Sequence, residues 1–237
     1  MEELTLLILG AGWTSTFLLP LLDAHNISFA ATTTSGRSVE GHPTLPFKFD
    51  PSAPADETRS AVASLPRARY VLVTFPLTGE GQSPRRPWIT RHSPYDKTKP
   101  RAVAEDELLA LSGCVLNLAG LWGGARDPKN WRNRVAATKE MVKGKKSLHL
   151  IHGVDVARAV VALVEGGDET WERSGRGQRW MLTDGFVYDW WALLAGWAEE
   201  GEDKEKPIEQ VKWVGELMRG GGCQGVAKVY GDAREVL

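Results

Sequence analysis

Six residues near the N-terminus have the composition and spacing of a phosphate-binding turn. Residues 10–15, with the sequence GAGWTS, follow one apolar run, residues 4–9, and precede another, residues 17–22. Gly10 permits a tight turn, and Gly12 lets the backbone approach a pyrophosphate. Ser15 takes the place of the third glycine in the G-x-G-x-x-G fingerprint, and a plain strand-to-helix turn is the alternative interpretation. The backbone amides expected to face the anion at the helix N-terminus are those of Trp13, Thr14 and Ser15.

Hydroxyl groups and a guanidinium follow the next predicted strand, residues 27–32. Dinucleotide-binding folds place an acidic residue on the adenine ribose roughly 20 residues beyond the glycines. Here that place holds threonines and a serine instead, and an arginine comes just after them. An acid would repel a 2′-phosphate, whereas these groups can bind one through charge-assisted hydrogen bonds. The sequence therefore favours NADP over NAD, although a solvated loop arginine is an equal alternative. The expected contacts are Thr33, Ser35 and Arg37.

Composition and charge exclude several classes of protein. The 237 residues carry 29 Lys and Arg against 30 Asp and Glu, a net charge of -1. This balance gives no reason to expect nucleic-acid binding or attraction to a membrane surface, and no apolar run is long enough to span a bilayer. Cys114 and Cys223 form neither a metal-ligand spacing nor a disulfide framework, so we expect a reducing compartment, the cytoplasm. The sequence leaves the oligomeric state open.

The pattern along the chain alternates between strands and helices, which is typical of an α/β fold. A strand over residues 70–75 should end at the same rim as the glycine turn and the 2′-phosphate residues, so Thr74, Phe75 and Pro76 become further candidate cofactor contacts. We predict a Rossmann-like, doubly wound, mostly parallel sheet in a three-layer αβα arrangement. Residues 1–165 form the expected NAD(P)-binding domain, and residues 166–237 a small C-terminal helical and substrate-covering part.

The individual elements are predicted from apolar periodicity, capping residues and turn residues. Residues 166–177 are expected to be a loop. The predicted strands are residues 6–9, 27–32, 47–50, 70–75, 114–119, 148–151 and 180–183, and the predicted helices are residues 17–22, 56–65, 101–111, 131–142, 155–164, 187–197 and 207–218.

Several segments together resemble the atypical extended short-chain dehydrogenases/reductases, also described as NAD-dependent epimerase/dehydratase-like proteins. The resemblance runs from about Leu4 to Trp197 and depends on the order and spacing of its parts. These are LILGAGWTS, YVLVTFP, NLAGLWGGAR, LHLIHGVDVARAVVALVE and RWMLTDG. It implies a Rossmann-like sheet, a bound NAD(P) and a small substrate-covering part. It does not imply one reaction, because the family includes epimerases, dehydratases, reductases and members without known activity.

The same resemblance implies a catalytic pair, since the family carries the signature Tyr-x-x-x-Lys. Tyr95 and Lys99 match it. A lysine ammonium beside the phenol favours phenolate, so the tyrosine could exchange a proton with a substrate while the nicotinamide exchanges a hydride. In the family this pair lies on a helix, and Pro100 disfavours a helix at this place. The alternative interpretation is therefore that Tyr95 and Lys99 are loop residues.

A structural element of the family pattern is missing from the sequence. Residues 77–100 show neither helical nor strand periodicity, and prolines interrupt them. In a doubly wound sheet a crossover helix and a fifth strand are expected at this place. If both are deleted, the strand at residues 114–119 pairs beside residues 70–75, or a gap remains in the sheet. The sequence thus predicts an NAD(P)-binding oxidoreductase or epimerase-like protein acting on an unknown hydroxyl or carbonyl substrate, with a catalytic half that such a deletion would impair. The alternative is a non-catalytic NAD(P)-binding sensor or regulatory protein.

Overall fold

The computed structural model describes residues 3–50, 52–75, 100–199 and 209–220. Contacts between its residues divide the chain into two units, residues 1–121 with 151–184 and residues 122–150 with 185–237. Among the helices in the described ranges, none has the length and apolar character that crossing a membrane requires. The elements of the first unit are β1 (Leu4–Leu9), α1 (Trp13–Ala24), β2 (Phe29–Thr33), β3 (Leu45–Pro46), α2 (Ala55–Ala63), β4 (Ala68–Val73), α3 (Pro100–Ala110), β5 (Val115–Leu118), α6 (Gly153–Glu165), α7 (Gly167–Thr170), the π-helical turn η2 (Trp171–Gly175) and β9 (Arg179–Leu182).

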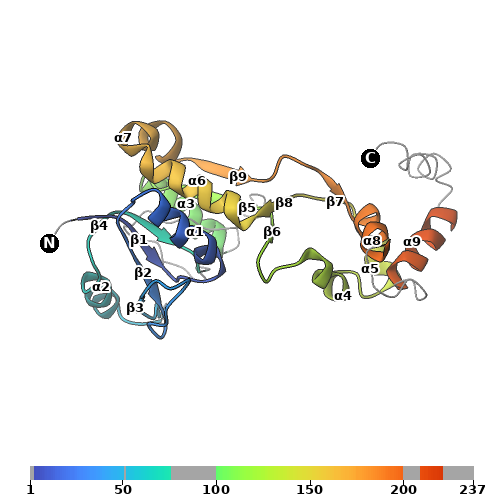
Figure 1. Cartoon of the computed structure of the whole chain (residues 1–237), viewed down its shortest axis with the longest axis horizontal. Helices are drawn as coiled ribbons and strands as arrows, with labels where there is room; N and C mark the ends of the chain where they lie inside the picture. Colours follow the sequence, from blue (N-terminus) through green and yellow to red (C-terminus); the bar gives the residue numbers. More distant parts are fainter. Residues whose placement is uncertain (1–2, 51, 76–99, 200–208, 221–237) are drawn as a thin grey trace. The chain divides into compact units, whose positions relative to one another are not determined.

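The first unit is built on a parallel sheet with the strand order β3-β2-β1-β4 (Figure 1). β1 lies between its two partners, so that Leu6 is opposite Phe29 on β2 and Tyr70 on β4. The carboxyl ends of these parallel strands therefore share one rim, as the strand–helix alternation predicts. β3 extends the sheet by a short pairing of Leu45 with Thr32.

Side chains of β1 alternate between two apolar cores, which confirms that this strand is buried on both faces. Leu6 and Ile8 pack with the inner sides of α1 and α6, and those two helices lie side by side over the sheet (Figure 1). Leu7 and Leu9 pack on the opposite face, where Leu108 of α3 covers them. Helices on both faces of a parallel sheet are the layers of a doubly wound fold, so the predicted Rossmann-like class is confirmed.

β5 continues this layer without pairing with β4. Its side chains alternate in the same way, with Leu116 in the α1 and α6 core and Val115 in the α3 core. Its backbone hydrogen bonds go to β9, which runs parallel to it. If a helix and a strand are deleted before residue 100, one of the two expected outcomes is direct pairing of β5 with β4. The structure does not show that pairing. Within the described ranges no strand pairs with the edge of β4 that faces away from β1.

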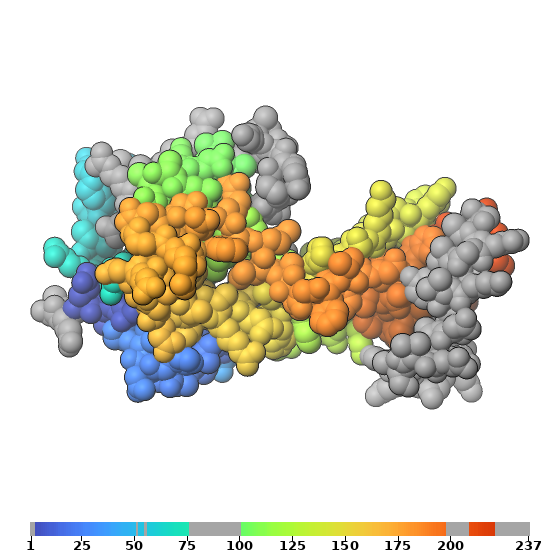
Figure 2. Space-filling view, turned by 90° about the horizontal axis from the view of Figure 1, so that it is seen from above, coloured from blue at the N-terminus to red at the C-terminus, as the bar shows by residue number. Residues whose placement is uncertain are grey.

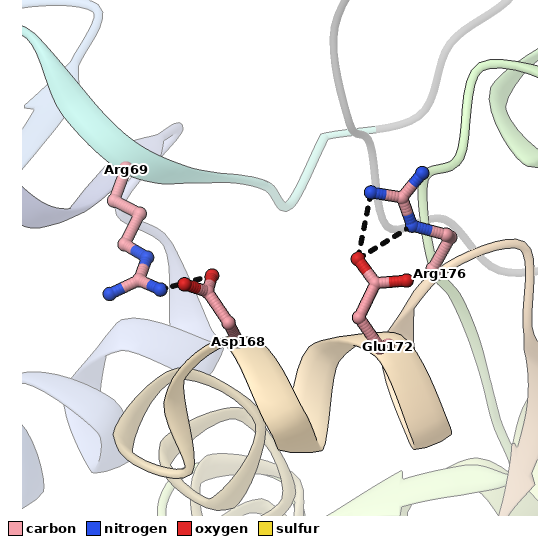
Figure 3. A network of polar contacts seen from close by, with 4 residues as sticks. All are labelled: Arg69, Asp168, Glu172 and Arg176. Carbon is pink, nitrogen blue, oxygen red and sulfur yellow. Dashed lines mark hydrogen bonds and ion pairs between the residues drawn. The ribbon is translucent and has the colours of Figure 1, made fainter.

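The segment that joins α6 to β9 contacts β4 through two of its side chains. Arg69 of β4 forms an ion pair with Asp168 of α7, and Glu172 binds Arg176 one turn later at 2.8 Å (Figure 3). Trp171 lies against Tyr70, with ring centroids 5.2 Å apart. In the space-filling view this segment, coloured orange, lies beside the yellow surface of α6 (Figure 2).

Beneath that segment is an apolar cavity of about 20 Å³. Its volume is close to that of one water molecule. The Cys114 thiol is fully buried at the wall, and burial raises its pKa to about 12. The lining residues are Leu6, Tyr70, Val71, Leu72, Cys114, Val160, Leu163, Val164 and Trp171.

Several expected elements are wrong in extent or kind. The strand expected over 148–151 is two short strands, Ser147–Leu148 and Leu150–His152, and the helix expected over 187–197 begins only at Trp190. The third strand lies at Leu45–Pro46 rather than 47–50, because a bond between the Thr33 and Thr44 hydroxyls sets the pairing earlier in the chain. The helix expected over 131–142 is broken, since the Thr138 side chain starts a new helix by accepting from Met141 N at 3.2 Å. The expected loop 166–177 is mostly helical, because Gly167, at a φ of 63°, lets the chain turn from one helix into the next.

The second unit holds a small aliphatic core, and partly buried tryptophans pack against it. Trp191 Nε1 donates to the Val142 carbonyl at 2.9 Å, and buried Gln210 donates to Ala136 O at 3.2 Å. The tryptophans of this unit thus contribute to its packing. The elements within or leading into this unit are β6 (Gly120–Trp122), the short 3-10 helix η1 (Pro128–Trp131), α4 (Arg132–Val135), α5 (Lys139–Lys143), β7 (Ser147–Leu148), β8 (Leu150–His152), β10 (Tyr188–Asp189), α8 (Trp190–Glu199) and α9 (Glu209–Gly220).

Candidate functional site

The glycine turn between β1 and α1 is held by the two strands next to it. Ala11 N donates to Thr32 O at 2.6 Å, and Gly10 N donates to the Thr32 hydroxyl at 3.1 Å, which ties the turn to β2. The Thr74 hydroxyl, just beyond β4, donates to Gly10 O. Thr32 and Thr74 are therefore the side chains that fix the turn, and hydroxyl residues at the ends of predicted neighbouring strands were the signal that could have found this role.

Gly10 and Gly12 are glycines for different reasons. Gly10 has a φ of 87°, and a Cβ atom there would lie 2.7 Å from Phe75 Cδ1. Such a substitution is strained both by its backbone and by its neighbour. Gly12 has an ordinary φ of -102°, and a Cβ atom there would meet nothing closer than Gly10 O at 3.8 Å. The packing around residue 12 therefore leaves room for a side chain, which a ligand lying close to the backbone would not.

The N-terminus of α1 is arranged to receive an anion. Gly12 is the N-cap, no side chain among the described residues caps the helix, and its first turn contains no acidic residue. The helix dipole is positive at this end, which faces the rim of the sheet. One donor is used internally, because Ser15 N donates to Gly12 O at 3.0 Å. This arrangement fits the pyrophosphate of a dinucleotide.

Ser15 and Trp13 contribute to the packing of this helix end. Ser15 is fully buried, and its hydroxyl has no hydrogen-bond partner within the described part of the chain. A small residue therefore suffices at the third position of the fingerprint. The Trp13 ring packs edge-on against Phe17, with centroids 5.0 Å apart, and against an apolar cluster that includes Leu121 and Ile151. Contacts of Trp13, Thr14 and Ser15 with a cofactor stay predictions.

The residues expected at a 2′-phosphate lie in and just after β2. Thr33 is buried, and its hydroxyl is 2.8 Å from that of Thr44, which in turn donates to Arg37 O at 2.7 Å. Because Thr44 has one hydroxyl hydrogen, Thr33 is the donor in their bond. Thr33 thus ties the loop to the sheet, and a direct contact between Thr33 and a cofactor stays a prediction.

Ser35 and Arg37 lie in the exposed part of this loop. Gly36 between them has a φ of 71°, which places the two residues on a turn. Within the described ranges the Arg37 guanidinium has no hydrogen bond or ion pair with another side chain. An arginine without a carboxylate partner at the end of β2 is available to a phosphate, because its fork of donors suits phosphate oxygens.

The remaining candidates divide between described and undescribed residues. Phe75 stacks on Phe49, with centroids 5.4 Å apart, and flanks Gly10. Pro76, Tyr95 and Lys99 lie outside the described residues, so their expected roles stay predictions.

His152 and Asp155, at the start of α6, have structural roles in the fold. His152 Nδ1 accepts from Val154 N at 3.2 Å and so caps α6. Asp155 binds Arg158 at 3.0 Å on the surface of the same helix.

Comparisons by sequence give no relative, since neither a protein-family model nor a curated protein matches the chain. Comparison of structures does. MoeE5 in complex with UDP-glucose and NAD is similar at a TM-score of 0.56 and 15% identity, over 84% of this chain and 82% of that one. The UDP-glucose 4-epimerase of Thermus thermophilus in complex with NAD has a TM-score of 0.54 and 15% identity, over 82% of each chain.

A third similar structure is a short-chain dehydrogenase/reductase superfamily protein from Agrobacterium tumefaciens with bound NAD. Its TM-score is 0.55 at 10% identity, over 82% of each chain. Identities this low carry information about the fold alone. The resemblance noted in the sequence is thereby confirmed at the level of architecture: the chain has the extended short-chain dehydrogenase/reductase fold, the fold of NAD-dependent epimerases.

Proposed function

We propose that this protein binds NADP at the rim formed by the glycine turn and the end of β2. The observation that carries the proposal is the N-terminus of α1, which no described side chain caps, beside a glycine whose surroundings leave room for a side chain. In this proposal the first amides of α1 bind the pyrophosphate, while Ser35 and Arg37 bind the 2′-phosphate. Thr74, Phe75 and Pro76 complete the rim on the side of β4.

The proposed activity is oxidoreductase or epimerase-like chemistry on a hydroxyl or carbonyl substrate. A bound nicotinamide supplies hydride exchange. Tyr95 is the proposed acid and base, and Lys99 its electrostatic support, although both lie outside the described residues. UDP-glucose, which the similar MoeE5 structure contains, is the first substrate to try. We also keep the cytoplasm as the expected compartment.

A substitution at Gly12 tests nucleotide binding separately from folding. In Gly12→Ser the new hydroxyl can cap α1, so the free energy of unfolding should stay the same or rise by about 0.3 kcal/mol. The same side chain occupies the approach of the pyrophosphate, so the Kd for NADPH should rise by at least about tenfold. Gly10→Ala is the contrasting variant, because its strain should lower stability by about 1–3 kcal/mol.

Titration calorimetry with NADPH and NADH, with unfolding curves for each variant, provides both measurements. Arg37→Ala should weaken NADPH about tenfold and leave NADH within about twofold, because only NADPH carries the 2′-phosphate. Failure of both nucleotides to bind wild-type protein at about millimolar concentration contradicts the proposal. Tighter binding of NADH than of NADPH contradicts the role of Arg37 and the preference for NADP, but not the binding of a nucleotide at this rim.

One observation favours a second candidate, a non-catalytic NAD(P)-binding sensor or regulatory protein. In the described ranges no strand pairs with the outer edge of β4, where the resemblance leads one to expect the family's fifth strand. The two candidates differ in turnover. With the matching substrate, an enzyme changes the absorbance of the nicotinamide or the configuration of the sugar, and Tyr95→Phe abolishes that change. A sensor binds NADPH with equal affinity in wild type and Tyr95→Phe and turns over none of the tested substrates.

A further inference from the structure

The loop that carries Arg37 is closed by a small hairpin. We call residues 34–44 the Arg37 loop. Val39 N donates to His42 O at 3.0 Å, and His42 N donates to Val39 O at 2.9 Å. The two residues between them, Glu40 and Gly41, have positive φ values of 48° and 79°, as a tight type I′ turn requires. Glu40 is a non-glycine residue in the left-handed region, so other contacts must hold this turn.

Those contacts come from the His42 imidazole, which joins the hairpin to the end of α1. His42 Nε2 is 2.6 Å from Asp23 Oδ2, and His42 Nδ1 is 3.3 Å from Val39 O. A carboxylate and a carbonyl can only accept hydrogen bonds. Both ring nitrogens must therefore donate, and only the protonated imidazolium does so. Neutral His42 can make one of the two bonds.

The surroundings of the ring favour its charged form. Asp23, on the last turn of α1, is the charged group that faces the ring, and its hydrogen bond is the main cause of a raised pKa of His42. The carbonyls of Val39 and Glu40 act in the same direction, while partial burial opposes them. From β2 the ring meets Phe29, with centroids 5.6 Å apart. The C-terminal end of a helix also favours a cation.

We propose that protonation of His42 fixes the Arg37 loop against α1 and thereby strengthens the binding of the 2′-phosphate of NADP. The link from His42 to Arg37 is short: Thr44, two residues after His42 in the chain, donates a hydrogen bond to the Arg37 carbonyl, and Thr33 anchors Thr44 to the sheet. A fixed hairpin therefore fixes the backbone of Arg37, which lowers the conformational entropy lost when its side chain binds a phosphate. This inference rests on the proposed function.

The direction of the pH dependence follows from the raised pKa. Below about pH 6.5, the ordinary value for histidine, His42 is protonated whether the loop is fixed or free, and the stabilisation is fully present. The stabilisation is lost as the pH rises through the pKa of His42 in the folded protein. The phosphate opposes this trend, because its second proton leaves near pH 6 and its charge grows as the pH rises. Variants must therefore be compared with wild type at each pH.

The test measures NADPH and NADH affinities between about pH 6 and about pH 9 in wild type, His42→Gln and Asp23→Asn. NADH lacks the 2′-phosphate. The ratio of the association constant for NADPH to that for NADH therefore removes pH effects that both nucleotides share. In wild type this ratio should fall, relative to His42→Gln, by about threefold across the range, the size expected for one partly exposed charged hydrogen bond. In Asp23→Asn the fall should begin at lower pH, because the carboxylate that raises the pKa of His42 is gone.

A second measurement needs no nucleotide. Hydrogen exchange at the Val39 and His42 amides, corrected for the intrinsic rate, should show protection that declines with pH in wild type and is low throughout in His42→Gln. Protection without binding of either nucleotide refutes the proposed function and, with it, the link to NADP. Binding of NADPH with the same pH profile in wild type and His42→Gln overturns this inference and leaves the proposed function intact.

Discussion

Replacing Gly153 by alanine tests how closely α1 packs on α6. A Cβ atom at this first residue of α6 would lie 2.9 Å from Phe17 Cζ, and closer still to Cδ2 and Cε2 of the same ring. Carbon atoms in favourable contact are about 3.5–4.0 Å apart, so the Phe17 ring would have to move. It has little room, because Trp13 lies 5.0 Å away on one side and His152 lies 5.4 Å away on the other.

Two opposing effects set the size of the change. Overpacking in a closely packed core costs about 1–3 kcal/mol. Alanine is the better helix former, but at the first residue of a helix it restores at most about 0.5–1 kcal/mol, the difference for a helix interior. We therefore expect Gly153→Ala to lower the free energy of unfolding by about 1–2 kcal/mol, which for a chain of this size lowers the Tm by about 2–8 °C.

Urea and thermal unfolding, followed by circular dichroism, measure this loss. Gly196→Ala in α8 is the matched control, because a Cβ atom there meets nothing within 4 Å. The control should be neutral or slightly stabilising. The double variant Phe17→Leu with Gly153→Ala should be more stable than the sum of the single changes predicts, since the smaller residue relieves the overlap. A Gly153→Ala protein as stable as wild type refutes the close approach of α1 and α6.

Three further predictions concern buried and titrating groups. Ser15→Ala should raise the free energy of unfolding by about 1 kcal/mol in urea titrations, because the buried hydroxyl has no partner within the described residues; a loss of that size would mean that the hydroxyl is bonded. In a Cys223→Ser background, the Cys114 thiol should not react with a disulfide reagent at about pH 8 until urea unfolds the protein, because burial raises its pKa to about 12; rapid reaction of the native protein would contradict this burial. The Tm difference between wild type and Asp23→Asn should be largest at about pH 6 and shrink as the pH rises, since the raised pKa of His42 favours the pair only while His42 is protonated; a difference that grows with pH would reverse the assigned sign.

Much of the first unit could be predicted because its determinants are local. The apolar run of β1 lies between two cores, so its composition alone indicates a strand buried on both faces. The glycine turn follows from residue types that tolerate its geometry, as the φ of Gly10 illustrates. These features depend on neighbours in the sequence, and the fold class follows from their alternation.

Features that depend on distant residues could not be predicted. The register of β3 is set by Thr33 and Thr44, which meet across a loop. Thr32 and Thr74 stand near the ends of predicted strands, which is a signal in the sequence, but the bonds of their hydroxyls to Gly10 exist only after three strands have paired. The His42 pair with Asp23 joins residues 19 positions apart and leaves no periodic signal. The roles of Tyr95 and Lys99, and the functional division at residue 165, stay predictions.

The pairing of β5 with β9 also has a consequence for synthesis on the ribosome. The first unit contains residues 1–121 and 151–184, so the chain leaves it after β5 and returns before its last strand. Val115 pairs with Arg179, and the nascent chain must therefore grow by some 60 residues before β5 finds its partner. Contacts this distant slow folding, and an unpaired strand edge attracts other chains in the meantime. We therefore expect nascent chains stalled before β9 to depend on chaperones far more than completed ones.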